Sequence, residues 1–468
     1  MKSSTSNSSF IDPDLPIPVL HHALVNGRIT SASLVEASLS RIKSLDSELS
    51  CFVLVDEQGA LSAAKAADSE IKSGNIRSLL HGIPYAIKDV YDVEGMATTC
   101  HSFARLGHIA QRNSSMASRL NEAGAILLGK LATHEFALGE FSTELPFPPA
   151  RNPWNKRHIP GGSSSGPAAA VAAGYVRFTL GTCTGGSIRI PAAWCGVVGL
   201  KPTYGRVSRS GVFPLAPSLD HCGPIAASVA EAAAVLQSMA GHDPSDPGSV
   251  DHPVPDYSAG IERGMAGLRI GLPVALFQAG SIRPEIRRRI GTLLAQLQSE
   301  GAEINDVDLA PYTWFTACGR VISSAESFAI HAEQLRHIPH KYSSASLSRL
   351  ATGFAVSEAD YQSAQNLRQA LKASVDRSLE NCDVLLAPIT LDTAPPFDPL
   401  PHFKTWPAHS YVFNVSGHPA ISVPIGLCSN GLPMAIQIAG RYFDEGMVFR
   451  VARSIEKLTA PMQPRAIS

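Results

Sequence analysis

The sequence has no excess of charge of either sign and little charge altogether. Its 468 residues include 39 lysines and arginines against 40 aspartates and glutamates, and charged residues make up 17% of the chain. A protein that binds nucleic acid through its phosphates needs a basic excess or stripe, and a polybasic membrane anchor needs one as well. We therefore expect neither nucleic acid nor a membrane among the partners of this chain.

Cysteine pairs, targeting signals and long apolar runs are also missing. The eight cysteines are scattered and form no C-x-x-C pair, whereas disulfide frameworks belong to short secreted chains. The first nine residues, MKSSTSNSS, contain no apolar stretch of the kind found in a signal peptide. The alanine-rich run at 167–176 is too short to span a bilayer. These features predict free, buried thiols and a cytoplasmic location.

Hydrophobic residues, in contrast, make up 44% of the chain, which is enough for a large core. Amphipathic helical segments alternate with short apolar segments, and this alternation is typical of an α/β fold with a parallel or mixed sheet. Residues 285–380 have a helical pattern throughout. We predict a loose N-terminal arm at 1–29 and one large α/β domain at 30–468, with a variable region at about 240–400.

Two glycine- and serine-rich loops are the strongest local features. Residues 160–166 read PGGSSSG, and residues 181–191 read GTCTGGSIRIP. Glycine lets backbone N–H groups approach a ligand closely, and a serine after two glycines can lie at a turn into a helix, where N–H groups hold a developing oxyanion. A serine nucleophile then needs a base. The alternative interpretation of each loop is a flexible polar connection.

Lys88 is a candidate for that base. It ends an apolar, strand-like segment at 83–90. A lysine with its ordinary pKa of about 10.4 is a poor base at neutral pH, but burial can lower that pKa by several units. The alternative is that Lys88 pairs with Asp89 or is exposed at the end of the strand.

A group of histidines further along the chain raises the question of a metal. The spacing of this group differs from the H-E-x-x-H pattern of zinc sites, so we expect a solvated helix face and no metal ion or other cofactor. The residues concerned are His331, Glu333, His337 and His340.

Several of these motifs together resemble the amidase signature family of serine hydrolases. The resemblance covers the chain from about 30 to 458. The matching segments are GIPYAIKD at 82–89, the two glycine loops, CGVVGLKPTYGRV at 195–207, SLDHCGP at 218–224, FN at 413–414, PAISVP at 419–424, GLP at 431–433 and QIAGR at 437–441.

The resemblance implies a single domain with a mixed, twisted β-sheet covered by helices. It also implies a triad in which Ser187 is the nucleophile, Ser163 is a bridging serine that follows a cis peptide bond, and Lys88 is the base. The backbone N–H groups of Thr184, Gly185 and Gly186, with that of Ser187, correspond to the family's oxyanion hole. The segment around 136–139 and the variable region correspond to the substrate pocket, so Leu138, Gly139 and Ser164 are candidate substrate-binding residues.

The aromatic side chains of the variable region could add an apolar wall to that pocket, or they could belong to the core. They are Tyr312, Trp314, Phe315 and Phe328.

The chain departs from the family at Cys183, where an acidic residue is usual. A thiol cannot form the ion pair that such a carboxylate would make with the nearby Arg189. The loop is then either braced differently, with weaker activity, or reshaped around a small apolar side chain.

The resemblance implies hydrolysis of a small, uncharged carboxamide or aryl or alkyl amide through an acyl-enzyme. Carbamates and ureas are an alternative substrate class within the family. Another alternative is the glutaminase subunit of a tRNA-dependent amidotransferase complex, but that subunit usually has glutamine after the arginine of the nucleophile motif, and here Ile190 stands there. A degenerate, inactive member is a third alternative, suggested only by Cys183. Many relatives dimerise, so a homodimer is an expected partner state.

Overall fold

A computed structural model describes residues 12–139, 141–278, 281–398, 409–460, 462 and 464. Its centre is one 11-stranded sheet with the strand order β1-β3-β2-β4-β6-β5-β10-β11-β9-β7-β8. The sheet is mixed, because β2 and β7 run parallel to both of their neighbours and the other pairs are antiparallel. The strands are β1 (Phe52–Val55), β2 (Pro84–Lys88), β3 (Ile126–Leu131), β4 (Phe178–Cys183), β5 (Val198–Lys201), β6 (His221–Ala226), β7 (Arg269–Pro273), β8 (Glu303–Val307), β9 (Val384–Pro388), β10 (Ala420–Leu427) and β11 (Pro433–Ala439).

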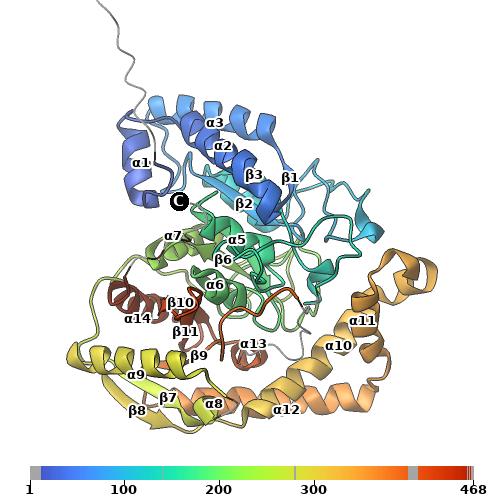
Figure 1. Ribbon diagram of the computed structural model, residues 1–468, viewed down its shortest axis with the longest axis vertical. Helices are drawn as coiled ribbons and strands as arrows, with labels where there is room; N and C mark the ends of the chain where they lie inside the picture. Colours follow the sequence, from blue (N-terminus) through green and yellow to red (C-terminus); the bar gives the residue numbers. More distant parts are fainter. Residues whose placement is uncertain are drawn as a thin grey trace, which may run out of the picture.

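Helices pack against this sheet along its length (Figure 1). Helices α2 and α3 lie beside β2 and β3, helices α5, α6 and α7 contact the middle strands, and α9 and α14 contact β10. Helices α10, α11 and α12 pack on one another at one end of the molecule. The helices are α1 (Ile17–Val25), α2 (Ser31–Leu49), α3 (Glu57–Lys72), α4 (Ser115–Glu122), α5 (Ser165–Ala172), α6 (Arg189–Cys195), α7 (Val229–Met239), α8 (Val274–Gln278), α9 (Pro284–Ser299), α10 (Tyr312–His337), α11 (Ser344–Phe354), α12 (Glu358–Ser378), α13 (Tyr411–Ser416) and α14 (Glu445–Lys457).

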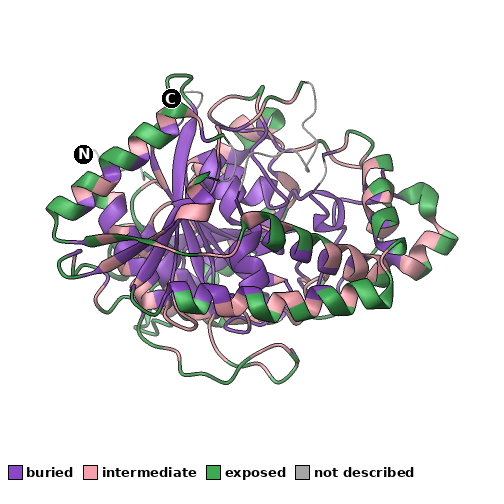
Figure 2. Ribbon diagram, turned by 90° about the horizontal axis from the view of Figure 1, so that it is seen from below, coloured by how far each residue is buried: buried purple, intermediate pink, exposed green. Residues whose placement is uncertain are grey.

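The core explains the strand pattern of the sequence. Strands β2, β4, β6, β9 and β11 are buried at every position, so they read as continuous apolar runs rather than as alternating ones. Figure 2 shows the buried strands at the centre, surrounded by helices whose outer faces are exposed. The predicted fold class, one large α/β domain with a mixed sheet under helices, is confirmed.

Two details differ from the sequence-based expectation. The region 285–380 is not helical throughout, because β8 extends the sheet beside β7; β8 has no fully buried position, so its sequence carries little apolar signal. The described part of the predicted N-terminal arm is not loose. Its helix α1 begins with Ile17, and the side chains of Ile17, Leu20 and Leu24 lie in the main hydrophobic core.

Candidate active site

The two glycine-serine loops meet Lys88 at one edge of the sheet. Strands β2 and β4 are parallel neighbours, so their carboxyl ends lie at the same edge, where ligands bind in many α/β proteins. Lys88 is the last residue of β2, and β4 leads directly into the loop that contains Ser187. The 161–164 loop lies between these two strands in the sequence and leads into α5. The candidate residues therefore converge although they are far apart in the chain.

Lys88 lies at the centre of this edge and is completely buried. Hydrogen bonds of 2.8 Å join its Nζ to Ser163 Oγ and to Thr182 Oγ1. Asp89 does not pair with it, because the Asp89 carboxylate forms a buried ion pair with Lys130 at 2.8 Å. The structure thus brings Lys88 and Ser163 together and adds Thr182, a contact that the sequence-based interpretation missed.

Burial lowers the pKa of Lys88 to about 7, although Cys183, Asp220, Cys222 and Cys100 act in the opposite direction. A buried ammonium loses the hydration that stabilises it in water, so the neutral amine is favoured. A large fraction of Lys88 is therefore uncharged at neutral pH. An uncharged amine can accept a proton, which is the property that a general base needs.

The two loops are fastened to each other by the backbone and side chain of Ser164. Its N–H donates to the Ser187 carbonyl at 3.2 Å, and its hydroxyl bonds both the N–H and the carbonyl of Thr182 at 3.3 and 3.2 Å. The Gly162–Ser163 peptide is cis. Ser164 is buried and connects the loops, whereas the resemblance to the family suggested it as a substrate-binding residue.

Close packing explains the glycines in these loops. A Cβ on Gly162 would lie 2.2 Å from the His134 ring, and a Cβ on Gly186 would lie 2.3 Å from Ser410 Cβ. Gly186 also has a φ of +123°, which residues with side chains rarely adopt. A larger residue at either position would displace its loop from His134 or from Ser410.

The loop after β4 has four backbone N–H groups with no acceptor among the described residues. They belong to Thr184, Gly185, Gly186 and Ser187. Buried backbone donors are nearly always paired in folded proteins, so consecutive free donors indicate a place for a negatively charged atom. The Ser187 side chain is only partly buried. Within the described part of the chain its hydroxyl makes no hydrogen bond, which leaves it free to react.

Polar residues from distant segments hold this loop. Thr184 Oγ1 donates to Asp220 Oδ1 at 2.5 Å, and Asp220 Oδ2 accepts the N–H groups of Leu215 and Ala216. Asn414 Nδ2 donates to the Cys183 carbonyl at 2.9 Å. Asp220 and Asn414 both lie in the motif segments at 218–224 and 413–414, but no chemistry in those motifs alone indicates that they support the loop after β4.

A cavity of about 570 Å³ opens beside the loop. Its walls include Ala137, Thr182, Thr184 and Asp220, together with an apolar side formed by residues 212–215. Leu138, Gly139 and Ser164 do not line this cavity.

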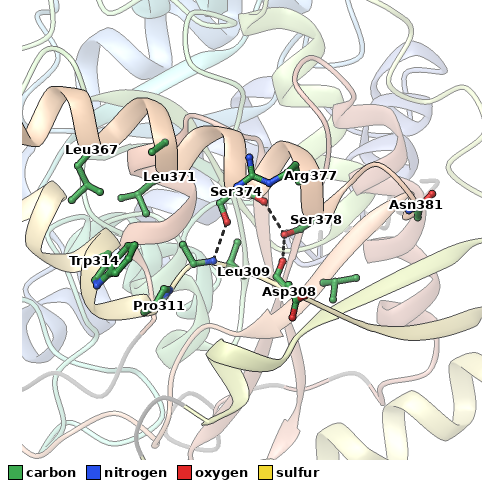
Figure 3. Close-up of a pocket in the computed structure, with 13 residues that line it drawn as sticks. Asp308, Leu309, Pro311, Trp314, Leu367, Leu371, Ser374, Arg377, Ser378 and Asn381 are labelled. Carbon is green, nitrogen blue, oxygen red and sulfur yellow. Dashed lines mark hydrogen bonds between the residues drawn. The ribbon is translucent and has the colours of Figure 1, made fainter.

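A separate cavity lies between α10, α12 and the segment after β8, and Figure 3 shows Trp314 in its wall. No residue of the two glycine loops lines it. Its serines are already bonded within the wall, since Ser374 Oγ accepts the Ala310 N–H and Ser378 Oγ donates to backbone carbonyls. Trp314 therefore faces this separate cavity, and Phe315 is in the core, as the alternative interpretation of the aromatic residues expected.

Most of the histidine group is solvated as expected, because Glu333 and His337 on α10 and His340 just after it are exposed, and His331 is the exception. His331 is fully buried, and its Nδ1 lies 2.9 Å from the Tyr342 hydroxyl. No three His, Cys, Asp or Glu side chains in the described part of the chain are arranged to hold a metal ion. Within the same residues, no helix combines the length and apolar character needed to cross a bilayer.

Known proteins of similar sequence and structure bear directly on this arrangement. The family model described as Amidase matches residues 33–449. This chain is a member of the amidase family. The match spans both glycine loops and Lys88, and it confirms the family that the motifs suggested.

Relatives within the family differ in their named activities. A glutamyl-tRNA(Gln) amidotransferase subunit of Anaeromyxobacter sp. (strain K) is 38% identical, with 93% of this chain and 95% of the relative covered. The peptide amidase of Stenotrophomonas maltophilia has a TM-score of 0.84 at 30% identity, over 96% of this chain and 98% of its own. A bacterial aryl acylamidase of the amidase signature family has a TM-score of 0.86 at 25% identity, over 96% of both chains. Membership of this family makes the chain a hydrolase of carbon–nitrogen bonds.

Proposed function

We propose that this amidase hydrolyses a small, uncharged carboxamide or aryl or alkyl amide, with Ser187 as nucleophile, Ser163 as proton relay and Lys88 as base. The observation that carries the proposal is the buried Lys88 amine, which lies 2.8 Å from Ser163 Oγ at the edge of a loop with four unpaired N–H groups. A base, a relay hydroxyl and an anion site are the parts that acyl transfer by a serine requires.

In this mechanism the neutral Lys88 amine takes the proton of the Ser163 hydroxyl as Ser163 takes that of Ser187. Ser187 Oγ then attacks the carbonyl carbon, and the carbonyl oxygen becomes an oxyanion among the N–H groups of residues 184–187. Collapse of this intermediate breaks the C–N bond, and Ser163, resupplied by Lys88, protonates the leaving nitrogen. Water, deprotonated by the same relay, then attacks the acyl-Ser187 ester and releases the acid.

The cavity wall favours an uncharged substrate. Arg209 and Asp246, the oppositely charged side chains that line it, are already bonded to each other, with Nη2 and Oδ1 2.7 Å apart. The Asp220 carboxylate is held by Thr184 and two N–H groups. The Arg209–Asp246 pair is therefore compensated, both Asp220 oxygens are hydrogen-bonded within the protein, and residues 212–215 offer an apolar surface to the substrate. A carbamate or urea would fit the same chemistry.

A glutaminase component of an amidotransferase complex is the second candidate. Its support is the amidotransferase relative that is 38% identical over nearly the whole chain. Against it, the residue after Arg189 is the buried, apolar Ile190, which packs beside Trp194 and Leu432. Sequence similarity across a family shows the fold and chemistry better than the substrate.

One experiment separates these candidates. The purified chain is incubated alone with a panel of small amides, carbamates, ureas and glutamine, released ammonia or amine is measured, and a fluorophosphonate probe tests Ser187. We expect turnover of an uncharged amide and labelling of Ser187. Turnover of glutamine alone, and only with an added partner protein, would support the second candidate; neither turnover nor labelling would refute the proposed function. Light scattering on the same sample tests the expected homodimer.

The pH dependence of the activity provides a further prediction. We expect kcat/KM to rise about tenfold per pH unit below a pKa near 7 and to level off above it. The sign follows from the chemistry, since only the deprotonated Lys88 amine can accept a proton. A profile that falls as the pH rises through 7 would require Lys88 to act as a cation instead.

A further inference from the structure

Arg189 follows the nucleophile loop and is an unusual buried cation. Its side chain is completely buried, yet no described carboxylate lies within ion-pair distance of it. Neutral oxygens accept from its terminal nitrogens: Gln437 Oε1 at 2.6 Å, Asn414 Oδ1 at 2.6 Å and the Ser410 carbonyl at 2.8 Å. Its Nε has no acceptor in the described structure. A guanidinium cannot lose its proton in a protein, and an uncompensated buried charge is strongly destabilising.

Cys183 lies on the other side of the same loop and faces this cation. Its side chain is fully buried, and the positive charge of Arg189 and the Ile188 N–H both act to lower the pKa of its thiol. The Ile188 N–H has no backbone acceptor among the described residues. Asn414 Oδ1, which accepts from Arg189, lies 3.4 Å from Cys183 Sγ. The sulfur therefore lies near a fixed positive charge, that of Arg189, and near the free Ile188 N–H donor. A protonated thiol would have the neutral oxygen Asn414 Oδ1 as its acceptor.

We propose that Cys183 is a thiolate, that it is the buried counter-ion of Arg189, and that this pair positions the nucleophile loop between them. Cys183 thus acts as a positioning residue for the reaction proposed above, on which the kinetic part of this inference rests. The pair spans the loop from the residue before Thr184 to the residue after Ile188. It fixes both ends of the segment that presents the four N–H groups and the Ser187 hydroxyl.

The other titratable groups around the pair do not provide an alternative counter-ion. Lys201 and His221 are bases and cannot supply a negative charge to Arg189, and burial lowers the pKa of each well below its usual value. Glu445, the carboxylate near Lys201, is bonded to the Thr203 N–H and lies 3.5 Å from Arg206. Burial lowers the pKa of Lys88 to about 7, so its amine is only partly charged at neutral pH and is a weaker partner for Cys183 than Arg189. The Asp220 carboxylate accepts a hydrogen bond from Thr184. Burial raises the pKa of the Cys183 thiol, but the charge of Arg189 and the Ile188 N–H act in the opposite direction, and the net shift is downward.

The first test measures the thiolate directly. A thiolate has an ultraviolet absorption band that a thiol lacks, and burial raises the pKa of each of the other seven cysteines. We expect the native protein to show this band at neutral pH, Cys183→Ser to lose it and Cys195→Ser to keep it. Cys195 is a matched control because it is equally buried, but the hydrogen bond of its sulfur is to the Pro160 carbonyl at 3.4 Å and no charged partner of it is found among the described residues. A native protein without the band, or a band that survives in Cys183→Ser, would overturn the proposal.

The second test detects the charge on Cys183 through its effect on Lys88, because a negative charge on Cys183 raises the pKa of Lys88. Replacing the thiolate by a neutral hydroxyl in Cys183→Ser should move the acid limb of kcat/KM downward by about one pH unit, whereas Cys183→Asp should leave it in place. We also expect kcat of Cys183→Ser to fall roughly ten- to hundredfold at nearly constant KM, because a displaced loop loses contacts formed in the transition state, and Cys183→Asp should recover most of it. If the acid limb of kcat/KM does not move in Cys183→Ser and moves to higher pH in Cys183→Asp, the native residue is a neutral thiol and the proposal is overturned.

These measurements separate this inference from the proposed function. If the protein hydrolyses no amide, the absorption test still reports the charge on Cys183. If Cys183→Ser does not fold, the band of the native protein and the pH profile of Cys183→Asp still decide the question.

Discussion

Ser187→Ala should abolish turnover, with kcat reduced by on the order of 10⁴–10⁶-fold, because losing a serine nucleophile removes the whole covalent route. The Ser187 hydroxyl is the only one in the loop that is unbonded within the described structure and next to the free N–H groups. Ser163 cannot replace it, since its oxygen is fully buried and bonded to Lys88. Steady-state kinetics on the best amide of the panel, with fluorophosphonate labelling of the variant, provide the measurement.

Ser422→Ala is the matched control for this substitution. Like that of Ser187, the hydroxyl of Ser422 makes no hydrogen bond in the described structure, although Ser422 is fully buried and Ser187 only partly so. It lies in β10 opposite Gly199, outside the two glycine loops. We expect Ser422→Ala to keep its activity and its labelling. Residual activity of Ser187→Ala above about one hundredth of the native rate, or labelling at another serine, would exclude Ser187 as the nucleophile.

The sequence predicts the two candidate loops far better than it predicts their support. Lys88, Ser163 and Ser187 could be selected because each follows or ends a recognisable local pattern, an apolar strand or a run of glycines. Thr182, which bonds Lys88, and Asn414, which holds the Cys183 carbonyl, could not be assigned these contacts. Their partners come from strands and helices that are distant in the sequence, and a polar residue in a motif does not indicate which backbone group it will face.

The prediction of strands from the sequence is limited in the same way. Buried segments such as β2 and β9 are apolar throughout and can be predicted, whereas β8 is half exposed and its sequence resembles the helical segments around it. Ser164 provides a second example, because the resemblance to the family suggests contact with a substrate. Its hydroxyl is directed to the backbone of β4 and not to the cavity. In both cases tertiary contacts decide what the local sequence leaves open.

The charges around the loop at 184–188 are compensated away from the cavity. Lys88 is kept largely neutral by burial, Lys130 is neutralised by Asp89 through their ion pair, and Arg189 faces Cys183. This distribution leaves the four free N–H groups as the main attraction for negative charge at the site. A site of this kind stabilises an oxyanion that forms during the reaction more than it stabilises a neutral amide in the ground state, and that difference is what accelerates a reaction.

Lys88→Ala should lower kcat by about 10²–10⁴-fold, the usual contribution of a general base, with a smaller change in KM. The amine that lies 2.8 Å from Ser163 Oγ is lost, and no other described basic group bonds that hydroxyl. Lys88→Arg separates the role of a base from that of a positive charge, because a guanidinium remains protonated. We expect Lys88→Arg to be as inactive as Lys88→Ala, and a small primary amine added to Lys88→Ala to restore part of the rate. Near-native activity of Lys88→Arg would show that the site needs only a cation, and it would remove the proton relay from the mechanism.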